Sequence, residues 1–288
     1  MAHRAVRPVS GGVLCVIGGA EDRVGDRVVL RELVRLAGGD GSRIAVVATA
    51  SSLGPEIHET YDHTFRDLGA GDVVGLRPES RADAEDPALA ARLADVDAVF
   101  MTGGNQLKLA SVVGGTAFGA AIAAAYARGV VVAGTSAGAS AVSEHMLAFG
   151  DDASSPRQGL TTSAAGLGLL PDVVVDQHFA QRNRYARLLS VVARSPRLLG
   201  LGVDEDTAAV VRAGRELEVV GAGCVFVADG SRAVSDAHLA ELGAPMLVSG
   251  VVVHTLPAGA RFDLVDRRLA SFVEEHLAAQ LQHQTEED

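Results

Sequence analysis

Short apolar runs that alternate with helical stretches constrain the fold of this 288-residue chain more than any other feature. The runs lie near residues 12–17, 43–49, 72–76, 97–102 and 130–134, and helical stretches such as 55–68 and 117–127 lie between them. Runs of this length are typical of buried strands, and an intervening helix lets successive strands pair in parallel. We therefore expect an α/β fold with a doubly wound, mostly parallel sheet flanked by helices.

The pattern changes after residue 208. Apolar runs over 208–211, 217–220, 224–228 and 247–256 follow one another closely, which predicts antiparallel strands at the edge of the sheet. Apolar residues recur at helical spacing over 266–283, so we expect an amphipathic C-terminal helix there. The chain is long enough for two small domains, but no linker or repeat divides it, and we expect a single domain over residues 1–288.

The segment 150–168 is rich in Ser, Asp, Gly and Thr and is too long for a plain connection. Two interpretations are open, a loop that gates substrate and a disordered insertion.

The most informative motif follows the apolar run at 130–133, where the sequence reads GTSAG over residues 134–138. A buried strand that leads into G-x-S-x-G and then a helix forms a nucleophile elbow, which presents the serine hydroxyl at a sharp turn. Side chains at Gly134 or Gly138 would collide with neighbouring backbone. Similar small-residue turns are common in chains rich in Ala and Gly, so Ser136 needs partners to count as a nucleophile.

Two candidate partners lie at the ends of later strands. His178 follows the apolar run 173–175, and Glu205 follows the run 200–203. Carboxyl ends of strands are where catalytic groups gather in open α/β sheets, and a serine nucleophile needs a base that a carboxylate orients. The order Ser, His, acid disfavours an α/β-hydrolase, in which the acid precedes the histidine. It is the order of class I glutamine amidotransferase-like folds, although those carry cysteine at the elbow.

Five blocks together resemble the cyanophycinases, in the serine peptidase family that also contains aspartyl dipeptidases. They are GGAED at 18–22, TGGNQL at 102–107, GTSAGA at 134–139, DQHF at 176–179 and GVDEDTA at 202–208. The resemblance implies a class I glutamine amidotransferase-like fold and a homodimer. It also implies hydrolysis of cyanophycin, a polyaspartate that carries arginine on each side-chain carboxyl, to β-aspartyl-arginine dipeptides.

The same resemblance assigns roles to residues at matching positions. It implies a catalytic triad of Ser136, His178 and Glu205, and it alone selects Glu205, because Asp204 and Asp206 flank it in an extended segment and point to the opposite face. It implies that the N–H groups of Gly104 and Ala137 form the oxyanion hole. The substrate-binding set comprises Asn105, Gln106, Asp176, Gln177, Arg182, Arg184 and Arg187.

The chemistry of the three arginines fits a substrate with carboxylates, which guanidinium groups bind through two parallel hydrogen bonds. A helix that begins near Gln181 would place Arg184 and Arg187 on one face, with Arg182 pointing elsewhere. The alternative is a solvated basic helix face. For residues 103–106 the alternative is an ordinary loop whose amides satisfy the backbone.

The charge and the remaining motifs argue against nucleic-acid binding and dinucleotide binding. A formal net charge of −11 argues against nucleic-acid binding, which needs clustered Lys and Arg. It suits a substrate that carries arginine, with Glu21, Asp22, Asp151 and Asp152 as candidate partners for guanidinium groups. Gly18-Gly19 lacks the rest of a dinucleotide motif, so we interpret it as a rim turn.

No metal, cofactor or membrane is expected. His58 and His63 are five residues apart, which does not match the spacing of a metal pair on a helix, and Cys15 and Cys224 lie in apolar runs as small hydrophobes. No apolar span reaches the roughly 20 residues of a membrane helix, and the first residues lack the apolar stretch of a leader, so we expect a cytoplasmic enzyme.

Two competing functions remain open at this stage. One is an aspartyl dipeptidase that acts on short Asp-containing peptides, against which the three arginines favour the polymer. The other is a binding module without catalytic activity on the same scaffold.

Overall fold

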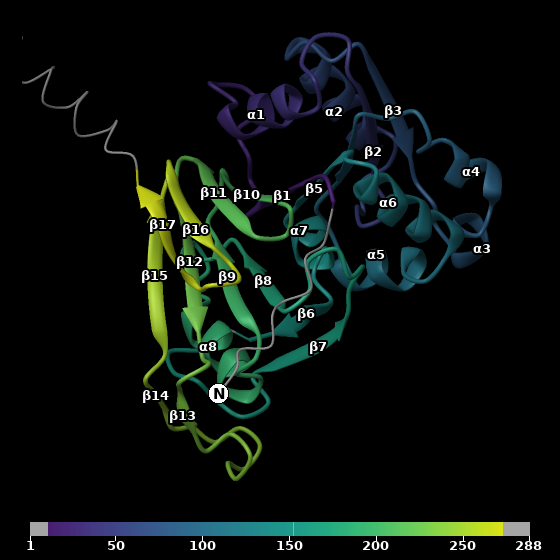
Figure 1. The fold of residues 1–288 in the computed structure, drawn as a ribbon. Helices are drawn as coiled ribbons and strands as arrows, with labels where there is room; N and C mark the ends of the chain where they lie inside the picture. Colours follow the sequence, from purple (N-terminus) through teal and green to yellow (C-terminus); the bar gives the residue numbers. More distant parts are fainter. Residues whose placement is uncertain (1–10, 152, 273–288) are drawn as a thin grey trace, which may run out of the picture.

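The computed structural model describes residues 11–151 and 153–272, and a nine-stranded sheet runs through its centre (Figure 1). Half of this sheet is parallel, in the spatial order β1-β5-β4-β2-β3. These strands are β1 (Val13–Ile17), β2 (Arg43–Val47), β3 (Asp72–Leu76), β4 (Ala98–Met101) and β5 (Val131–Thr135). The predicted parallel sheet is confirmed, and each strand lies within two residues of its predicted bounds.

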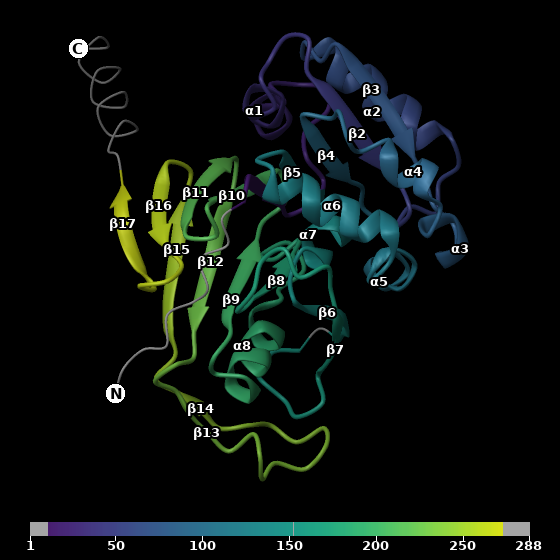
Figure 2. The same cartoon turned by 45° about the vertical axis from the view of Figure 1, so that its right-hand side comes forward.

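Helices cover both faces of the parallel strands, because alternate strand residues point to opposite sides. Cys15 and Ile17 pack with α1 (Val28–Leu36) and α2 (Glu56–Asp67), whereas Leu14 and Val16 face the opposite layer. That second layer contains α3 (Arg81–Ala84), α4 (Pro87–Ala91), α5 (Gln106–Val113) and α6 (Ala117–Ala127). Figure 2 shows α6 in front of the parallel strands, with α5 below it. The doubly wound arrangement is therefore as predicted.

The other half of the large sheet is antiparallel and extends from β1 in the order β10, β11, β16, β17. Its strands are β10 (Thr207–Arg212), β11 (Glu216–Gly221), β16 (Ala260–Asp263) and β17 (Arg268–Phe272). The predicted antiparallel edge is thus present. The predicted helix over 266–283 is wrong at its start, because residues 268–272 form β17, and residues 273–283 lie outside the described range.

A second sheet of four strands lies beside the first, in the order β15-β12-β9-β8. Its strands are β8 (Val173–Gln177), β9 (Leu199–Val203), β12 (Cys224–Asp229) and β15 (Val252–Pro257). The helix α8 (Tyr185–Arg194) packs on it through Leu188, Val191 and Val192, which contact the apolar side chains of Val174 and Ala228. The strands β8 and β9 carry the residues that precede His178 and Glu205, so this sheet supports half of the candidate site.

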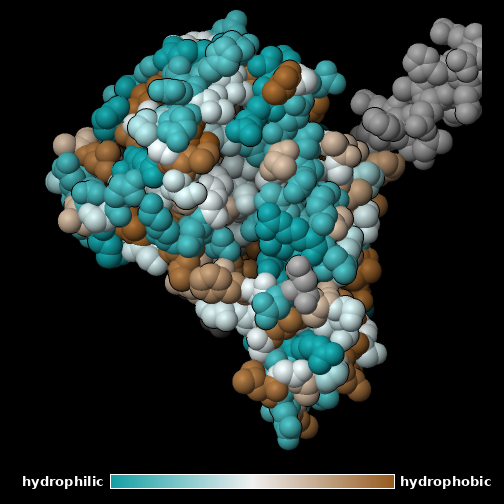
Figure 3. Space-filling model, turned by 180° about the vertical axis from the view of Figure 1, so that it is seen from behind, coloured by the Kyte–Doolittle hydropathy of each residue, from teal (hydrophilic) through white to brown (hydrophobic). Residues whose placement is uncertain are grey.

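Two short hairpins complete the described chain. The strands β6 (His145–Gly150) and β7 (Thr161–Ala165) pair with each other, so the segment 150–168 is partly a strand rather than a loop throughout. The strands β13 (Val234–Ser235) and β14 (Val248–Ser249) form an extension in which Leu239 and Leu242 are exposed. The apolar patches on this extension are visible from behind in Figure 3. The run predicted as one strand over 247–256 is therefore divided between β14 and β15.

None of the helices within the described ranges has both the length and the apolar character to cross a membrane alone. The helices α5 and α6 meet that test only as a pair, bent by 97° between them, and the apolar side chains of both are packed in the core.

Candidate active site

Ser136 lies between β5 and the short helix α7 (Ala137–Ala141), at a sharp turn with φ 51° and ψ −105°. A positive φ is unfavourable for a residue with a side chain and persists only where the surroundings hold it. The two glycines of the motif allow this turn. A Cβ on Gly134 would lie 2.3 Å from the carbonyl carbon of Gly138, and one on Gly138 would lie 2.4 Å from the carbonyl oxygen of Met101. The predicted elbow, with its steric reason, is present.

His178 and Glu205 meet because β8 and β9 are parallel neighbours in which Gln177 is paired with Val203. The residues that follow these strands therefore emerge at the same edge of the sheet. Nε2 of His178 lies 2.9 Å from Oγ of Ser136, and Nδ1 lies 2.6 Å from Oε1 of Glu205. With its proton on Nδ1, the imidazole donates to the carboxylate and accepts the serine proton, which is the arrangement that activates a serine.

The turn at Gly18-Gly19 holds both the nucleophile and the base. The N–H of Ser136 donates to the carbonyl of Ile17 at 3.0 Å, and the N–H of His178 donates to the carbonyl of Gly18 at 2.8 Å. Gly19 has φ 98°, and a Cβ there would lie 2.4 Å from Cε1 of the His178 ring. The sequence indicates only a rim turn here, because the contact with the imidazole depends on a pairing of distant segments that no local pattern reveals.

Burial is the largest influence on His178 and lowers the pKa of its imidazole below the ordinary value of 6.5. The hydrogen bond that His178 donates to Glu205 opposes this shift, and the positive charge of Arg182 adds to it. A lowered pKa keeps the imidazole neutral at neutral pH, which is the form that accepts a proton.

Two backbone N–H groups flank the serine. Ala137 follows Ser136 directly, and Gly104 belongs to the turn after β4, where its neighbour Gly103 lies close enough that an added Cβ would be 3.4 Å from Cβ of Ser136. Within residues 11–151 and 153–272, neither the N–H of Gly104 nor that of Ala137 is paired with an acceptor. Gly104 has φ 136° and could not carry a side chain, since a Cβ would lie 2.1 Å from the carbonyl oxygen of Ala50.

Asp176, Arg184 and Arg187, which the sequence assigns to substrate binding, are buried, and both guanidinium groups pair with the carboxylate of Asp176. The side chain of Asp176 has no exposed surface. Its Oδ2 accepts from Nε of Arg187 at 2.7 Å, and its Oδ1 accepts from Nη2 of Arg187 at 2.5 Å and from Nη1 of Arg184 at 3.1 Å. Arg184 and Arg187 do share a face, as predicted, but that face points into the protein and α8 begins at Tyr185.

The remaining members of the predicted binding set divide between structural and accessible positions. Nε2 of Gln106 donates to the carbonyls of Leu147 and Ala148, so this side chain ties α5 to β6. Oδ1 of Asn105 caps α5, while the residue remains exposed. Oε1 of Gln177 lies 3.5 Å from Oγ of Ser136. Arg182 is exposed beside His178 and is the arginine of this block that solvent reaches most freely.

The acidic candidates for guanidinium binding are also largely occupied. Glu21 is buried and accepts hydrogen bonds from Tyr61 and Thr135. The carboxylate of Asp22 accepts the N–H groups of Val24, Gly25 and Arg27, and these bonds, chiefly that from Arg27, lower its pKa to about 2. Asp151 is exposed, and Asp152 lies outside the described residues.

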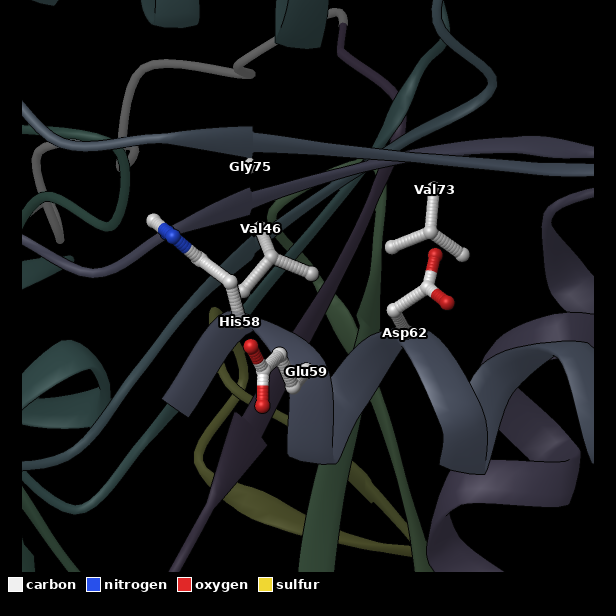
Figure 4. Close-up of a pocket in the computed structure, with 6 residues that line it drawn as sticks. All are labelled: Val46, His58, Glu59, Asp62, Val73 and Gly75. Carbon is white, nitrogen blue, oxygen red and sulfur yellow. The ribbon is translucent and has the colours of Figure 1, made fainter. Parts of the chain in front are cut away.

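Two pockets of the described part of the chain are lined by residues other than the triad. Figure 4 shows one of about 310 Å³ beside α2, lined by Val46, His58, Glu59, Asp62, Val73 and Gly75. A second, of about 390 Å³, lies at the C-terminal end of α8 and includes Arg194 and Arg197. No three His, Cys, Asp or Glu side chains within the described ranges could hold a metal ion. The thiols of Cys15 and Cys224 are not joined in a disulfide, and burial raises the pKa of Cys15 to about 12.

An α/β fold that presents a Ser–His–Glu relay at a nucleophile elbow defines a serine-type hydrolase. The model of peptidase family S51 matches residues 14–220 of this chain. The chain belongs to that family and is a peptidase.

Curated relatives support this assignment, and a solved structure shares the fold. The chain is 38% identical over 251 residues to a cyanophycinase of Geminocystis herdmanii, covering 86% of this chain and 92% of the relative. It is 39% identical over 255 residues to a cyanophycinase of Trichormus variabilis, covering 88% and 85%. The crystal structure of a peptidase from an acI-B1 actinobacterium matches with a TM-score of 0.62 at 22% identity over 89% of this chain and 98% of the other, which shows the shared fold.

Proposed function

We propose that this peptidase is a serine-type exopeptidase that hydrolyses cyanophycin, multi-L-arginyl-poly-L-aspartate, to β-aspartyl-arginine dipeptides. The observation that carries the proposal is the relay from Ser136 through His178 to Glu205, with spacings of 2.9 and 2.6 Å. The relatives named cyanophycinase match this chain over nearly all of its length and supply the substrate.

The proposed reaction proceeds through an acyl-enzyme. Oγ of Ser136 attacks the carbonyl carbon of a backbone peptide bond while His178 accepts the serine proton, and the imidazolium then donates that proton to the leaving amine. A water molecule attacks the resulting ester, with His178 again as base, and releases the dipeptide. Glu205 orients the imidazole and stabilises its charged form during both steps.

The negative charge that develops on the carbonyl oxygen needs donors that are already in place. We assign this role to the N–H groups of Gly104 and Ala137, because both flank Ser136 and neither is paired within the described part of the chain. Fixed donors stabilise a tetrahedral intermediate more than the planar substrate and so accelerate the reaction.

Arg182, Gln177 and Asn105 are the proposed substrate contacts. Arg182 is exposed and could bind a carboxylate of the polymer through two parallel hydrogen bonds. Gln177 lies within 3.5 Å of the nucleophile, and the amide of Asn105 retains its N–H donors after capping α5. The predicted homodimer and cytoplasmic location stay predictions.

Replacing Ser136→Ala tests this function. We expect release of β-aspartyl-arginine from cyanophycin, followed by liquid chromatography, to fall at least about 10³-fold, because the nucleophile is lost while the fold persists. Circular dichroism should report an unchanged fold. A variant that keeps full turnover would contradict the mechanism, and a wild-type enzyme that prefers a short aspartyl dipeptide to cyanophycin would contradict the substrate.

A further inference from the structure

A buried carboxylate that the proposed mechanism does not use lies next to the elbow. Glu21 is 6% exposed, and no Lys, Arg or His within the described ranges forms an ion pair with it. Two hydroxyl groups hold it instead. Its Oε1 accepts from the phenol of Tyr61 at 2.5 Å, and its Oε2 accepts from Oγ1 of Thr135 at 2.5 Å. Hydrogen bonds to a carboxylate are stronger than those between neutral groups.

One end of this chain of hydrogen bonds is rigidly anchored. The ring of Tyr61 packs against Phe100, with ring centroids 4.7 Å apart, and against Phe65 at 5.8 Å. Burial raises the pKa of Tyr61, and the nearby charge of Glu21 raises it further, so the phenol keeps its proton and donates it. The carboxylate is therefore fixed relative to α2.

The other end reaches the residue that precedes the nucleophile. Thr135 is the last residue of β5, and Ser136 after it has φ 51° and ψ −105°. Such a conformation is held by the groups around it rather than by its own preference. The turn that contains Gly18 and Gly19, which supports His178, leads directly into Glu21. Glu21 thus connects Thr135, which precedes the nucleophile, with the turn that supports His178.

The geometry points to Glu21 as a positioning residue of the active site, which acts through Thr135 to hold Ser136 in its strained turn. It does not touch the substrate, and the inference rests on the proposed role of Ser136 as the nucleophile. The hydrogen bonds from Tyr61 and Thr135 should therefore function as one unit, because each is useful only while the other holds the carboxylate in place.

The test compares Thr135→Val, which removes the bond to Glu21, with Thr135→Ser, which keeps a hydroxyl donor. The control is Thr64→Val, which removes a different buried hydroxyl, on α2, that donates to the carbonyl of Thr60. We measure kcat and KM on cyanophycin and the rate at which a fluorophosphonate probe labels Ser136. Displacement of reacting groups by about 1 Å costs roughly 100-fold in rate. We expect Thr135→Val to lower kcat and the labelling rate by about 10- to 100-fold with KM nearly unchanged, and Thr135→Ser and Thr64→Val to stay near wild type.

A double variant provides the second measurement. Tyr61→Phe keeps the ring but removes the other donor to Glu21, so the combination with Thr135→Val should lower kcat no further than Thr135→Val alone. If the kcat losses of the two single variants multiply in the double variant, the two hydrogen bonds to Glu21 do not act as one unit. Wild-type labelling rates in Thr135→Val, or equal losses in Thr135→Ser, would overturn the positioning role. The labelling reaction needs no polymer. A wild-type enzyme that is labelled by the probe but leaves cyanophycin intact would contradict the proposed substrate. The labelling rates of the variants would still test the role of Glu21 in that case.

Discussion

At the scale of single residues, the choice of the orienting acid shows what sequence alone could not settle. Asp204, Glu205 and Asp206 are adjacent carboxylates, and spacing does not distinguish them. The structure gives each a different partner. Asp204 accepts the N–H groups of Ala180 and Cys224 at 3.0 Å, Asp206 accepts that of Asp22 at 2.9 Å, and Glu205 alone of the three contacts His178. The family resemblance selected the carboxylate that the geometry supports.

Replacing Glu205→Gln should therefore lower kcat strongly, while Asp206→Asn serves as a matched control. An amide can stabilise the wrong tautomer of the imidazole, and loss of an orienting acid in this way costs up to about 10⁴-fold. We expect a fall of about 10²- to 10⁴-fold in kcat for Glu205→Gln and less than about threefold for Asp206→Asn. Steady-state kinetics on cyanophycin measure both. Equal effects of the two substitutions would show that Glu205 has no special role.

The pH dependence of kcat/KM should reflect His178. Its pKa is lowered in the folded enzyme, so the imidazole stays neutral, and activity persists, until the pH falls below the ordinary value of 6.5. Below its pKa the imidazolium cannot accept the serine proton, and the rate declines. We expect the midpoint of the acidic limb below pH 6.5, and a higher midpoint in Arg182→Gln because a positive charge beside the ring is removed. A wild-type midpoint at or above 6.5 would contradict the burial of the base.

At the scale of elements, the turn after β1 matters more than its sequence indicated. A glycine pair after a strand is compatible with many turns, and only the return of residue 178 to this turn makes Gly19 a steric requirement. Gly38 is a useful comparison because its φ of 109° is close to the 98° of Gly19, yet nothing lies within 4 Å of a Cβ added there.

Replacing Gly19→Ala should lower kcat by at least about 10-fold, since the new methyl group would displace the imidazole from Ser136. Gly38→Ala should carry a similar backbone cost of about 1–2 kcal/mol without any effect on kcat. Thermal unfolding of both variants measures the cost of backbone strain, and steady-state kinetics measure the effect of displacing the imidazole. A Gly38→Ala variant as slow as Gly19→Ala would assign the loss to strain alone.

The arginines and the C-terminal segment show what helical spacing alone does not reveal. Helical spacing placed Arg184 and Arg187 correctly on one face, but spacing does not reveal whether a face is buried, and Asp176 in the neighbouring strand decides this. After residue 263 the carboxylate of Asp263 accepts the N–H groups of Val265 and Asp266, which forms a tight turn. The open edge of β16 then offers hydrogen-bonding partners to residues 268–272, and this pairing overrides the helical pattern.

At the scale of the whole molecule, the parallel half of the large sheet could be predicted because it depends on local alternation of strand and helix. The four-stranded sheet could not, because it depends on which edges remain open. The edge of β1 is occupied by β10, so β8 pairs with β9, and β9 pairs with β12, in a separate sheet. The strand pattern was visible in the sequence, whereas the division between sheets follows from long-range pairing.

The buried cluster around Asp176 should contribute to the stability of the whole chain. It joins β8 to α8, and Nη1 of Arg187 also donates to the carbonyl of Gly150 at the end of β6. Breaking a buried ion pair leaves an uncompensated charge and costs about 3–5 kcal/mol. We expect Asp176→Asn to lower the free energy of unfolding by about that amount, as measured by urea denaturation.

The matched control is Asp172→Asn, directly before the same strand, whose partner Arg197 has a side chain that is 71% exposed. An exposed pair contributes about 0–1 kcal/mol, so this variant should denature almost like the wild type. If the two variants lose the same stability, the cluster at Asp176 is not the internal connection that its burial indicates.

The central position of β1 has a consequence for the protein during its synthesis. This strand pairs with β5, which leads to Ser136, and with β10, which begins just after Glu205. A growing polypeptide on the ribosome can bring the first and second of these strands together early, but the third emerges only when most of the chain has been made. A ribosome-bound fragment that ends before residue 205 lacks both Glu205 and β10, so the proposed relay can form only after most of the chain has been made.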